Sequence, residues 1–225
     1  MNISKFSRAL KITLTSVLLL GSQLAAAQFD TGSVINLNWS SLGSQSGGNG
    51  AFSGSIVSGP GAGTSFVSFC LEKFETFNLN SNLFVKNVST TTTTADPLSA
   101  ETAWLFSQYS NNAVGYTATT NSKNLSMQNA FWFLEGEITQ SVLNADTQAK
   151  NWVTAAQTAV TSGAWSGVGN VRVLNLYKDV NYGTAAQDQL VMLAPVPEPE
   201  TYAMLLAGLG MMGAVVRKRK QTRQL

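Results

Sequence analysis

Residues 64–72 read Thr-Ser-Phe-Val-Ser-Phe-Cys-Leu-Glu, and this stretch is the strand around which the predicted fold is built. Its aromatic and β-branched residues favour an extended conformation, and Cys70 falls near the end of the strand. Ser/Gly-rich turns separate it from two earlier strands. The other predicted strands are Val34–Trp39, Ala51–Val57, Phe74–Leu79, Leu83–Val88, Val171–Tyr177 and Gln189–Leu193.

Three helices are predicted between the early and the closing strands. The first begins with Asp96 as N-cap and Pro97 at the first helical position. The second covers Ser122–Glu135, and the third runs from an Asp146 cap to Gly163. This order predicts an α+β fold, a mainly antiparallel β-sheet with an inserted three-helix region, plus an N-terminal signal helix and a C-terminal transmembrane helix.

The N-terminal segment has the three parts of a secretory signal peptide. Lys5, Arg8 and Lys11 form a positive region, Ile12–Leu20 is apolar, and residues 25–27 are an Ala-Ala-Ala cleavage site. We therefore expect an exported protein with three parts. These are a signal peptide at 1–27, a surface domain at 28–194 and a sorting signal at 195–225.

The tail also has three parts: a Pro-Glu-Pro motif, an apolar helix expected at 201–216, and a basic stop. At about 1.5 Å per residue this helix is a little short for a hydrocarbon core of about 30 Å, which suits a temporary anchor. Basic residues at its end belong on the cytoplasmic side. The motif is Val196, Pro197, Glu198 and Pro199, and the stop is Arg217, Lys218, Arg219 and Lys220.

This layout closely resembles the PEP-CTERM sorting signal of Gram-negative bacteria. The resemblance implies that an exosortase at the inner membrane recognises the Pro-Glu-Pro region and removes the tail. The protein would be anchored transiently by its C-terminal helix and then reach the cell surface or extracellular matrix, often with exopolysaccharide. An ordinary C-terminal membrane anchor is the alternative, but it would not require Pro-Glu-Pro.

The composition excludes several classes of function for the domain at 28–194. Without the two end segments, six basic and ten acidic residues remain, a net charge near −4, so no basic patch indicates nucleic acid. The absence of His removes Ser/His/Asp and Cys/His catalysis and most zinc sites. We expect no catalytic residues, no metal and no cofactor. Glu72 and Glu75 invite comparison with a glycosidase, but their spacing fixes no carboxylate pair.

The single Cys needs an explanation in an exported chain, because it cannot close an internal disulfide. Cys70 lies in Phe69-Cys70-Leu71-Glu72, and Gln128 lies in a motif on the second predicted helix, Met127-Gln128-Asn129-Ala130-Phe131-Trp132. Together these motifs resemble the thioester domains of Gram-positive surface adhesins, whose signature is aromatic-Cys-aliphatic and, later, Gln-x-Ala-aliphatic-Trp. Phe131 departs from that pattern, since an aliphatic residue is commoner there.

The resemblance implies an internal thioester between Cys70 and Gln128, formed with loss of ammonia. Phe69, Leu71, Phe131 and Trp132 would surround it. An amine on a surface or matrix partner would take the acyl group, so the protein would be an adhesive and not an enzyme. The alternatives are that Cys70 is a small buried hydrophobe and Gln128 a satisfied core residue, or that Cys70 forms an intermolecular disulfide. The protein would then be an exopolysaccharide-associated structural or carbohydrate-binding domain.

Overall fold

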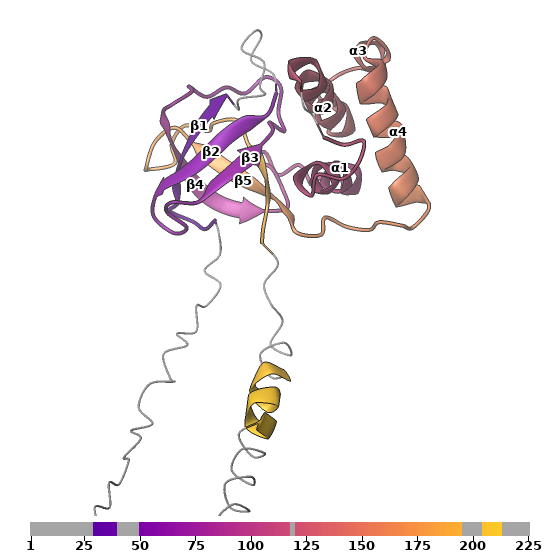
Figure 1. Ribbon diagram of the computed structural model, residues 1–225. Coiled ribbons are helices and arrows are strands. Elements are labelled where there is room, and N and C mark those ends of the chain that lie inside the picture. The colour runs from indigo at the N-terminus through magenta and orange to yellow at the C-terminus, as the bar shows by residue number, and fades with distance from the viewer. Residues whose placement is uncertain (1–28, 40–49, 118–119, 195–203, 213–225) are drawn as a thin grey trace, which may run out of the picture.

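A computed structural model describes residues 29–39, 50–117, 120–194 and 204–212. The predicted signal peptide, the Pro-Glu-Pro motif and the basic stop lie outside these ranges. Figure 1 shows a curved sheet beside a group of helices, with the short C-terminal helix separated from both.

Six antiparallel strands form a single sheet in the order β3-β2-β1-β4-β5-β6. The mainly antiparallel sheet predicted from the sequence is therefore confirmed. The closing strand β5 has the predicted bounds, whereas Phe74–Leu79 forms no strand. The strands are β1 (Val34–Trp39), β2 (Phe52–Ser58), β3 (Ser65–Ser68), β4 (Asn82–Ser89), β5 (Val171–Tyr177) and β6 (Gln189–Met192).

The sheet curves until its two edge strands meet. Just beyond the end of β3, Cys70 forms an isolated antiparallel bridge with Gln189 at the start of β6. Main-chain hydrogen bonds on both sides of this bridge join Leu71 N to Asp188 O at 3.1 Å and Leu190 N to Phe69 O at 3.0 Å. The edges of the sheet, which would otherwise carry unpaired main-chain groups, are thus joined at the cysteine.

Four helices, not the predicted three, lie between β4 and β5 in the part of the chain described. The first starts later than predicted because Pro97 pairs with Thr91 in an extended bridge, and Ser99 caps the helix by accepting the Thr102 N–H at 3.1 Å. Asp146 does cap the last helix, as predicted. The helices are α1 (Ala100–Ser110), α2 (Asn121–Leu134), α3 (Gln140–Asn144) and α4 (Thr147–Thr161).

The interior is divided into two apolar clusters. In one, α1 packs against β5, β6 and α4, and α4 packs against α2. The other fills the concave side of the sheet and contains Cys70 together with residues of β1, β2, β4 and β5. Cys70 therefore lies in the sheet's own interior, while its neighbours Phe69 and Leu71 lie in the cluster beneath the helices.

The C-terminal helix covers residues 204–212, and its large apolar side chains are exposed. No helix in the described ranges is long and apolar enough to cross a membrane. The ends of the span predicted at 201–216 fall outside those ranges.

Candidate functional site

Gln128 on α2 reaches Cys70, just beyond the end of β3, through the main chain of the cysteine. Gln128 Oε1 accepts the Cys70 N–H at 3.0 Å, and Gln128 Nε2 donates to the Cys70 carbonyl at 2.7 Å. Both residues are buried. One carboxamide thus forms hydrogen bonds with both the N–H and the carbonyl of Cys70, which have no partner in the sheet. These two bonds hold the main chain of the cysteine in place.

The thiol faces two other glutamines, one just before β6 and one at its start. Cys70 Sγ lies 2.8 Å from Oε1 of Gln187, and Nε2 of Gln189 lies 3.2 Å from Sγ. Nε2 of the Gln187 carboxamide donates a hydrogen bond to the main-chain carbonyl of Glu72. Oε1 of Gln189 lies 2.9 Å from the Ser68 hydroxyl. The sulfur is therefore enclosed by two oriented carboxamides.

Burial raises the pKa of the Cys70 thiol from 9.0 to about 12. The hydrogen bond from Gln189 lowers that pKa, and the negative charge of Glu72 raises it further. The thiol is therefore protonated at neutral pH. To act as a nucleophile it must lose its proton to a neighbouring base.

Two buried carboxyl groups, those of Glu72 and Asp188, lie next to the segment that carries Gln187 and Gln189. Oε2 of Glu72 accepts the Asp188 N–H at 3.1 Å. The carboxylate of Asp188 accepts from Leu176 N and Asn175 Nδ2, both at 3.1 Å, and from the Thr93 hydroxyl at 2.8 Å. Burial is the main cause that raises the pKa of Glu72 to about 8 and that of Asp188 to about 6. Asp188 thereby fixes the main chain between the two glutamines.

The predicted surroundings of the thioester lie mostly on the other side of the strand from the thiol. Phe69 meets Phe131 edge to face, with ring centroids 5.1 Å apart, and Leu71 belongs to the same cluster beneath the helices. Trp132 is 4% exposed and lies under Lys73, whose Nζ is 5.8 Å from the ring. These side chains exclude water from the Cys70 main chain, whereas the sulfur contacts the carboxamides of Gln187 and Gln189.

Gln187, Asp188 and Gln189 are site residues that the sequence motifs did not identify. The signal that could have found them is a run of three polar residues directly before the apolar Leu-Val-Met of β6. All three are buried in the structure. Polar side chains that are buried at the start of a strand must have partners, and here the partners surround the single cysteine.

Raising the pH from 5 to 9 is expected to lower the melting temperature by several degrees. The pKa of Glu72 is raised from 4.5 and that of Asp188 from 3.8, so the folded state holds these protons more tightly than the unfolded state. This contribution to stability is complete at pH values below the pKa values of the two carboxyl groups in the unfolded chain. It is lost as the pH rises through about 6 and then about 8. Thermal unfolding followed by circular dichroism tests this, and Glu72→Gln should flatten the upper part of the decline.

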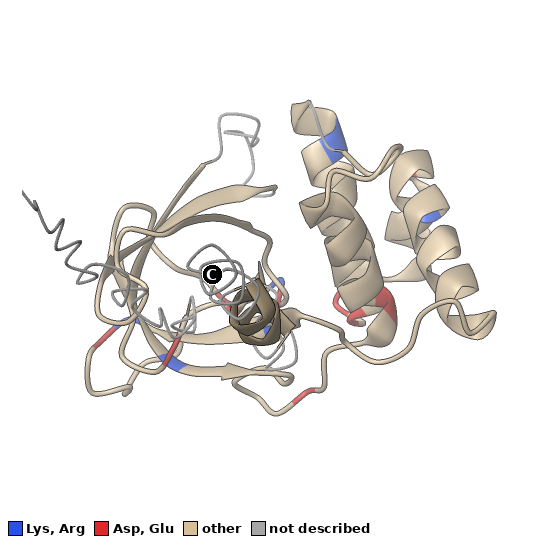
Figure 2. Ribbon diagram, turned by 60° about the horizontal axis from the view of Figure 1, so that its bottom comes forward, with Lys and Arg blue, Asp and Glu red and all other residues tan. Residues whose placement is uncertain are grey.

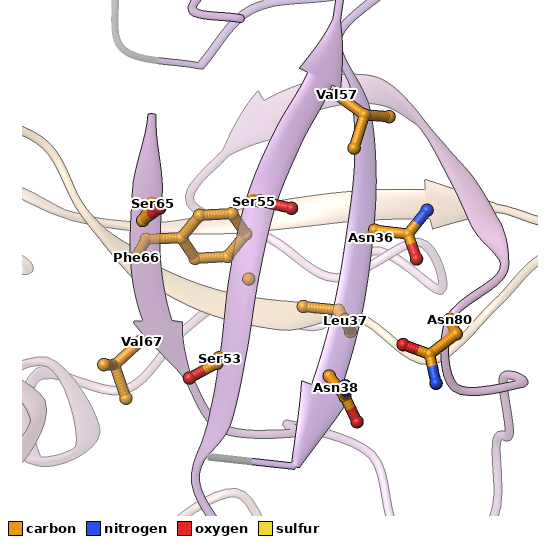
Figure 3. Close-up of a pocket in the computed structure, with 11 residues that line it drawn as sticks. Asn36, Leu37, Asn38, Ser53, Ser55, Val57, Ser65, Phe66, Val67 and Asn80 are labelled. Atoms are coloured by element: carbon orange, nitrogen blue, oxygen red, sulfur yellow. The ribbon is translucent and has the colours of Figure 1, made fainter. Parts of the chain in front are cut away.

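A second feature is an open groove of about 630 Å³ over β1, β2 and β3. Figure 3 shows side chains from these strands, and Asn80 from the loop before β4, around it. Phe66 reaches across to Gly54, where an added Cβ would lie 2.2 Å from the ring, so glycine is required for this contact. None of the lining residues is charged. They include the amides of Asn36, Asn38 and Asn80 and the hydroxyls of Ser53, Ser55 and Ser65.

In Figure 2 the Lys, Arg, Asp and Glu positions are few and scattered along the ribbon in the part of the chain that the structure describes. Within the same ranges, no group of three or more Cys, Asp or Glu residues is arranged to hold a metal ion.

Comparison with protein families identifies the tail. Residues 195–220 match the PEP-CTERM protein-sorting motif. The chain is therefore an exported protein that an exosortase processes and that is anchored transiently in the membrane through its C-terminal region. No curated protein and no solved structure matches the chain. The match covers the tail alone, so the function of the domain rests on its own geometry.

Proposed function

We propose that this exported protein is a covalent adhesin of the cell surface or matrix, with an internal thioester between Cys70 and Gln187. The observation that carries the proposal is the 2.8 Å contact between Cys70 Sγ and Oε1 of Gln187. Since a carbonyl bond is about 1.2 Å long, Cδ of Gln187 lies within about 4 Å of the sulfur. Gln128, by contrast, uses both ends of its carboxamide on the Cys70 main chain.

The other polar groups fit roles in this reaction. The Cys70 sulfur attacks Cδ of Gln187, the S–C bond forms, the C–N bond breaks, and the thiol proton leaves with the nitrogen as ammonia. Gln189 stabilises the sulfur as it becomes negative, because its Nε2 donates toward Sγ. The buried, oriented groups hold the reactants close together, which is the main advantage of an intramolecular reaction.

The stored bond gives the domain a single-use electrophile. An amine on a surface or matrix partner attacks the thioester carbonyl, an amide to Gln187 forms, and Cys70 returns to the thiol. Because the site is consumed once, the protein acts as an adhesive and not as an enzyme. The sorting motif supports this function, since it directs the domain to the outside, where such partners are present.

Intact mass spectrometry of the full-length protein in mild detergent tests the proposal. We expect a native mass short by one ammonia, and a gain of one methylamine after incubation with that amine. The Cys70→Ala variant should show neither change. A full native mass, together with a thiol that reacts in the unfolded protein, would refute the thioester.

The groove over β1, β2 and β3 favours a second function, binding of a neutral polysaccharide. Its amides and hydroxyls offer both donors and acceptors, the Phe66 ring offers an apolar surface, and the lining carries no charge. This chemistry suits uncharged sugars and agrees with the exopolysaccharide setting of PEP-CTERM proteins. The function requires no covalent step, and the same protein can have both activities.

Substituting Ser55 with Glu is expected to weaken binding of a neutral polysaccharide at least tenfold, a change of about 1.4 kcal/mol. The reason is that a charged side chain would occupy the middle of the groove. Titration calorimetry with the neutral exopolysaccharide of the expressing bacterium measures the effect. Thr154→Glu, on the exposed face of α4, is the matched control. Equal binding by Ser55→Glu and the wild type would exclude the groove.

A further inference from the structure

The hydroxyl group of Ser68 is buried beside the thiol and the two glutamines that contact it. Ser68 is the last residue of β3, two residues before Cys70, and its exposed fraction is 0%. Its Oγ lies 2.9 Å from Oε1 of Gln189 and 2.8 Å from the main-chain carbonyl of Leu190. Both of these atoms are acceptors, so the hydroxyl group is the donor and its single proton is directed between them.

The Ser68 hydroxyl determines which end of the Gln189 carboxamide faces the sulfur. A carboxamide accepts at its oxygen and donates at its nitrogen. Since Oε1 of Gln189 faces the Ser68 hydroxyl, Nε2 is turned toward Cys70 Sγ, 3.2 Å away. Nε2 also lies 3.5 Å from the main-chain carbonyl of Gln187, a second acceptor that favours this orientation. The opposite orientation would present an oxygen to the sulfur and leave the sulfur without this donor.

The contacts of the sulfur in this structure correspond to the end of the proposed capture reaction. Cys70 is a free thiol, and Gln187 is an intact carboxamide. Capture of an amine gives the same two groups, with one substituent added to the nitrogen of Gln187. The donor from Gln189 is therefore in place when the S–C bond has broken and the sulfur holds the electron pair. A hydrogen bond to the charged form of a group stabilises that form.

The burial of Cys70 makes a donor to its sulfur important. Burial raises the pKa of the thiol to about 12, whereas the hydrogen bond from Gln189 lowers it. A thiolate leaves more slowly as the pKa of its thiol rises. The rate at which the thioester is opened should therefore depend on whether Gln189 presents its nitrogen or its oxygen to the sulfur.

We infer that Ser68 is a positioning residue for the thioester chemistry, because its hydroxyl group orients the Gln189 carboxamide to donate to the Cys70 sulfur. The inference rests on the proposed function. During formation, the sulfur bonds to Cδ of Gln187, the C–N bond breaks, and the thiol proton leaves with the nitrogen as ammonia. During capture, the amine nitrogen bonds to the same carbon, the S–C bond breaks, and a proton of the amine passes to the sulfur. Ser68 forms no covalent bond and exchanges no proton in either step.

The test is the rate of methylamine capture by the full-length protein, followed by intact mass spectrometry on the fraction that lacks one ammonia at the start. We expect Ser68→Ala to react about 10-fold more slowly than the wild type, and Gln189→Ala about 10- to 100-fold more slowly. Ser68→Thr keeps a hydroxyl group and should retain most of the wild-type rate. Formation uses the same donor, so the fraction that lacks ammonia should fall in the same order.

A double-mutant cycle separates positioning from a merely structural role. If Ser68 acts only through Gln189, the variant with both residues changed to Ala should react within about twofold of Gln189→Ala alone. Independent effects would multiply instead. Ser33→Ala is the matched control, since Ser33 is also 0% exposed and its hydroxyl donates to the main-chain carbonyl of Pro60 at 2.7 Å. This control should capture methylamine at the wild-type rate.

The inference fails if Ser68→Ala captures methylamine as fast as Ser33→Ala, or if the two effects multiply in the double variant. If Ser68→Ala does not fold, Ser68→Val replaces it, and Ser68→Thr, which has the same shape with a hydroxyl group, is its control. Each of these failures leaves the thioester itself intact. A wild-type protein that has its full mass and captures no amine would instead refute the proposed function and this inference with it. The mass of the wild type thus distinguishes the two failures.

Discussion

Replacing Gln187 with Ala is expected to abolish methylamine capture and leave Cys70 as a free thiol. The variant lacks the carbonyl that lies 2.8 Å from the sulfur, so no acyl bond forms and no ammonia is lost. Intact mass spectrometry and titration of thiols in the unfolded protein measure both effects.

Gln128→Ala is the matched control for this experiment. We expect it to lower the free energy of unfolding by about 2–4 kcal/mol, because the N–H and carbonyl of Cys70 lose their partners. The folded fraction should still lose ammonia and capture amine. Gln189→Ala should form the thioester more slowly, since it lacks the donor to the sulfur. Capture by Gln187→Ala, with none by folded Gln128→Ala, would assign the thioester to Gln128.

The sequence motifs identified two residues of the candidate site but not the carboxamides that contact the thiol. The Cys70 and Gln128 motifs predict that a strand end and a helix meet, and the structure brings them together. A motif does not tell whether a carboxamide binds the main chain or the thiol. Gln187 and Gln189 lie more than a hundred residues from Cys70, and only the pairing of β6 with the end of β3 brings them close.

Secondary structure was predicted correctly from the sequence where local sequence signals and tertiary packing favour the same conformation. The strand β5 and the Asp146 cap of α4 were predicted correctly. Phe74–Leu79 contains three apolar residues, but Phe74 is 81% exposed and Phe77 packs against Phe52, with ring centroids 5.3 Å apart. Asp96-Pro97 resembles a helix start, yet a tight turn with Ala95 at φ 72° and the bridge to Thr91 hold it extended. Such long-range pairing overrides local helix signals.

Asp188→Ala is expected to have the largest effect on stability, a loss of about 3–5 kcal/mol. The carboxylate accepts from donors on β5 and on the loop after β4, and the variant leaves these buried donors unsatisfied. For a domain of this size such a loss lowers the melting temperature by roughly 6–20 °C. Thermal unfolding at pH 7.5 measures it, where the carboxyl group is ionised despite a pKa raised to about 6.

The same substitution should slow thioester formation, because Asp188 holds the main chain between Gln187 and Gln189 in register with Cys70. Asp146→Ala is the comparison, since that carboxylate caps α4 and accepts from Ser126 and Asn129 on α2 but does not contact the thiol, and its loss should cost about 1–2 kcal/mol. If Asp188→Ala were no less stable than Asp146→Ala, the polar network would not support the sheet closure. If it were unstable but formed the thioester at the wild-type rate, Cys70 and Gln187 would be aligned by Gln128 and the edge bridge alone.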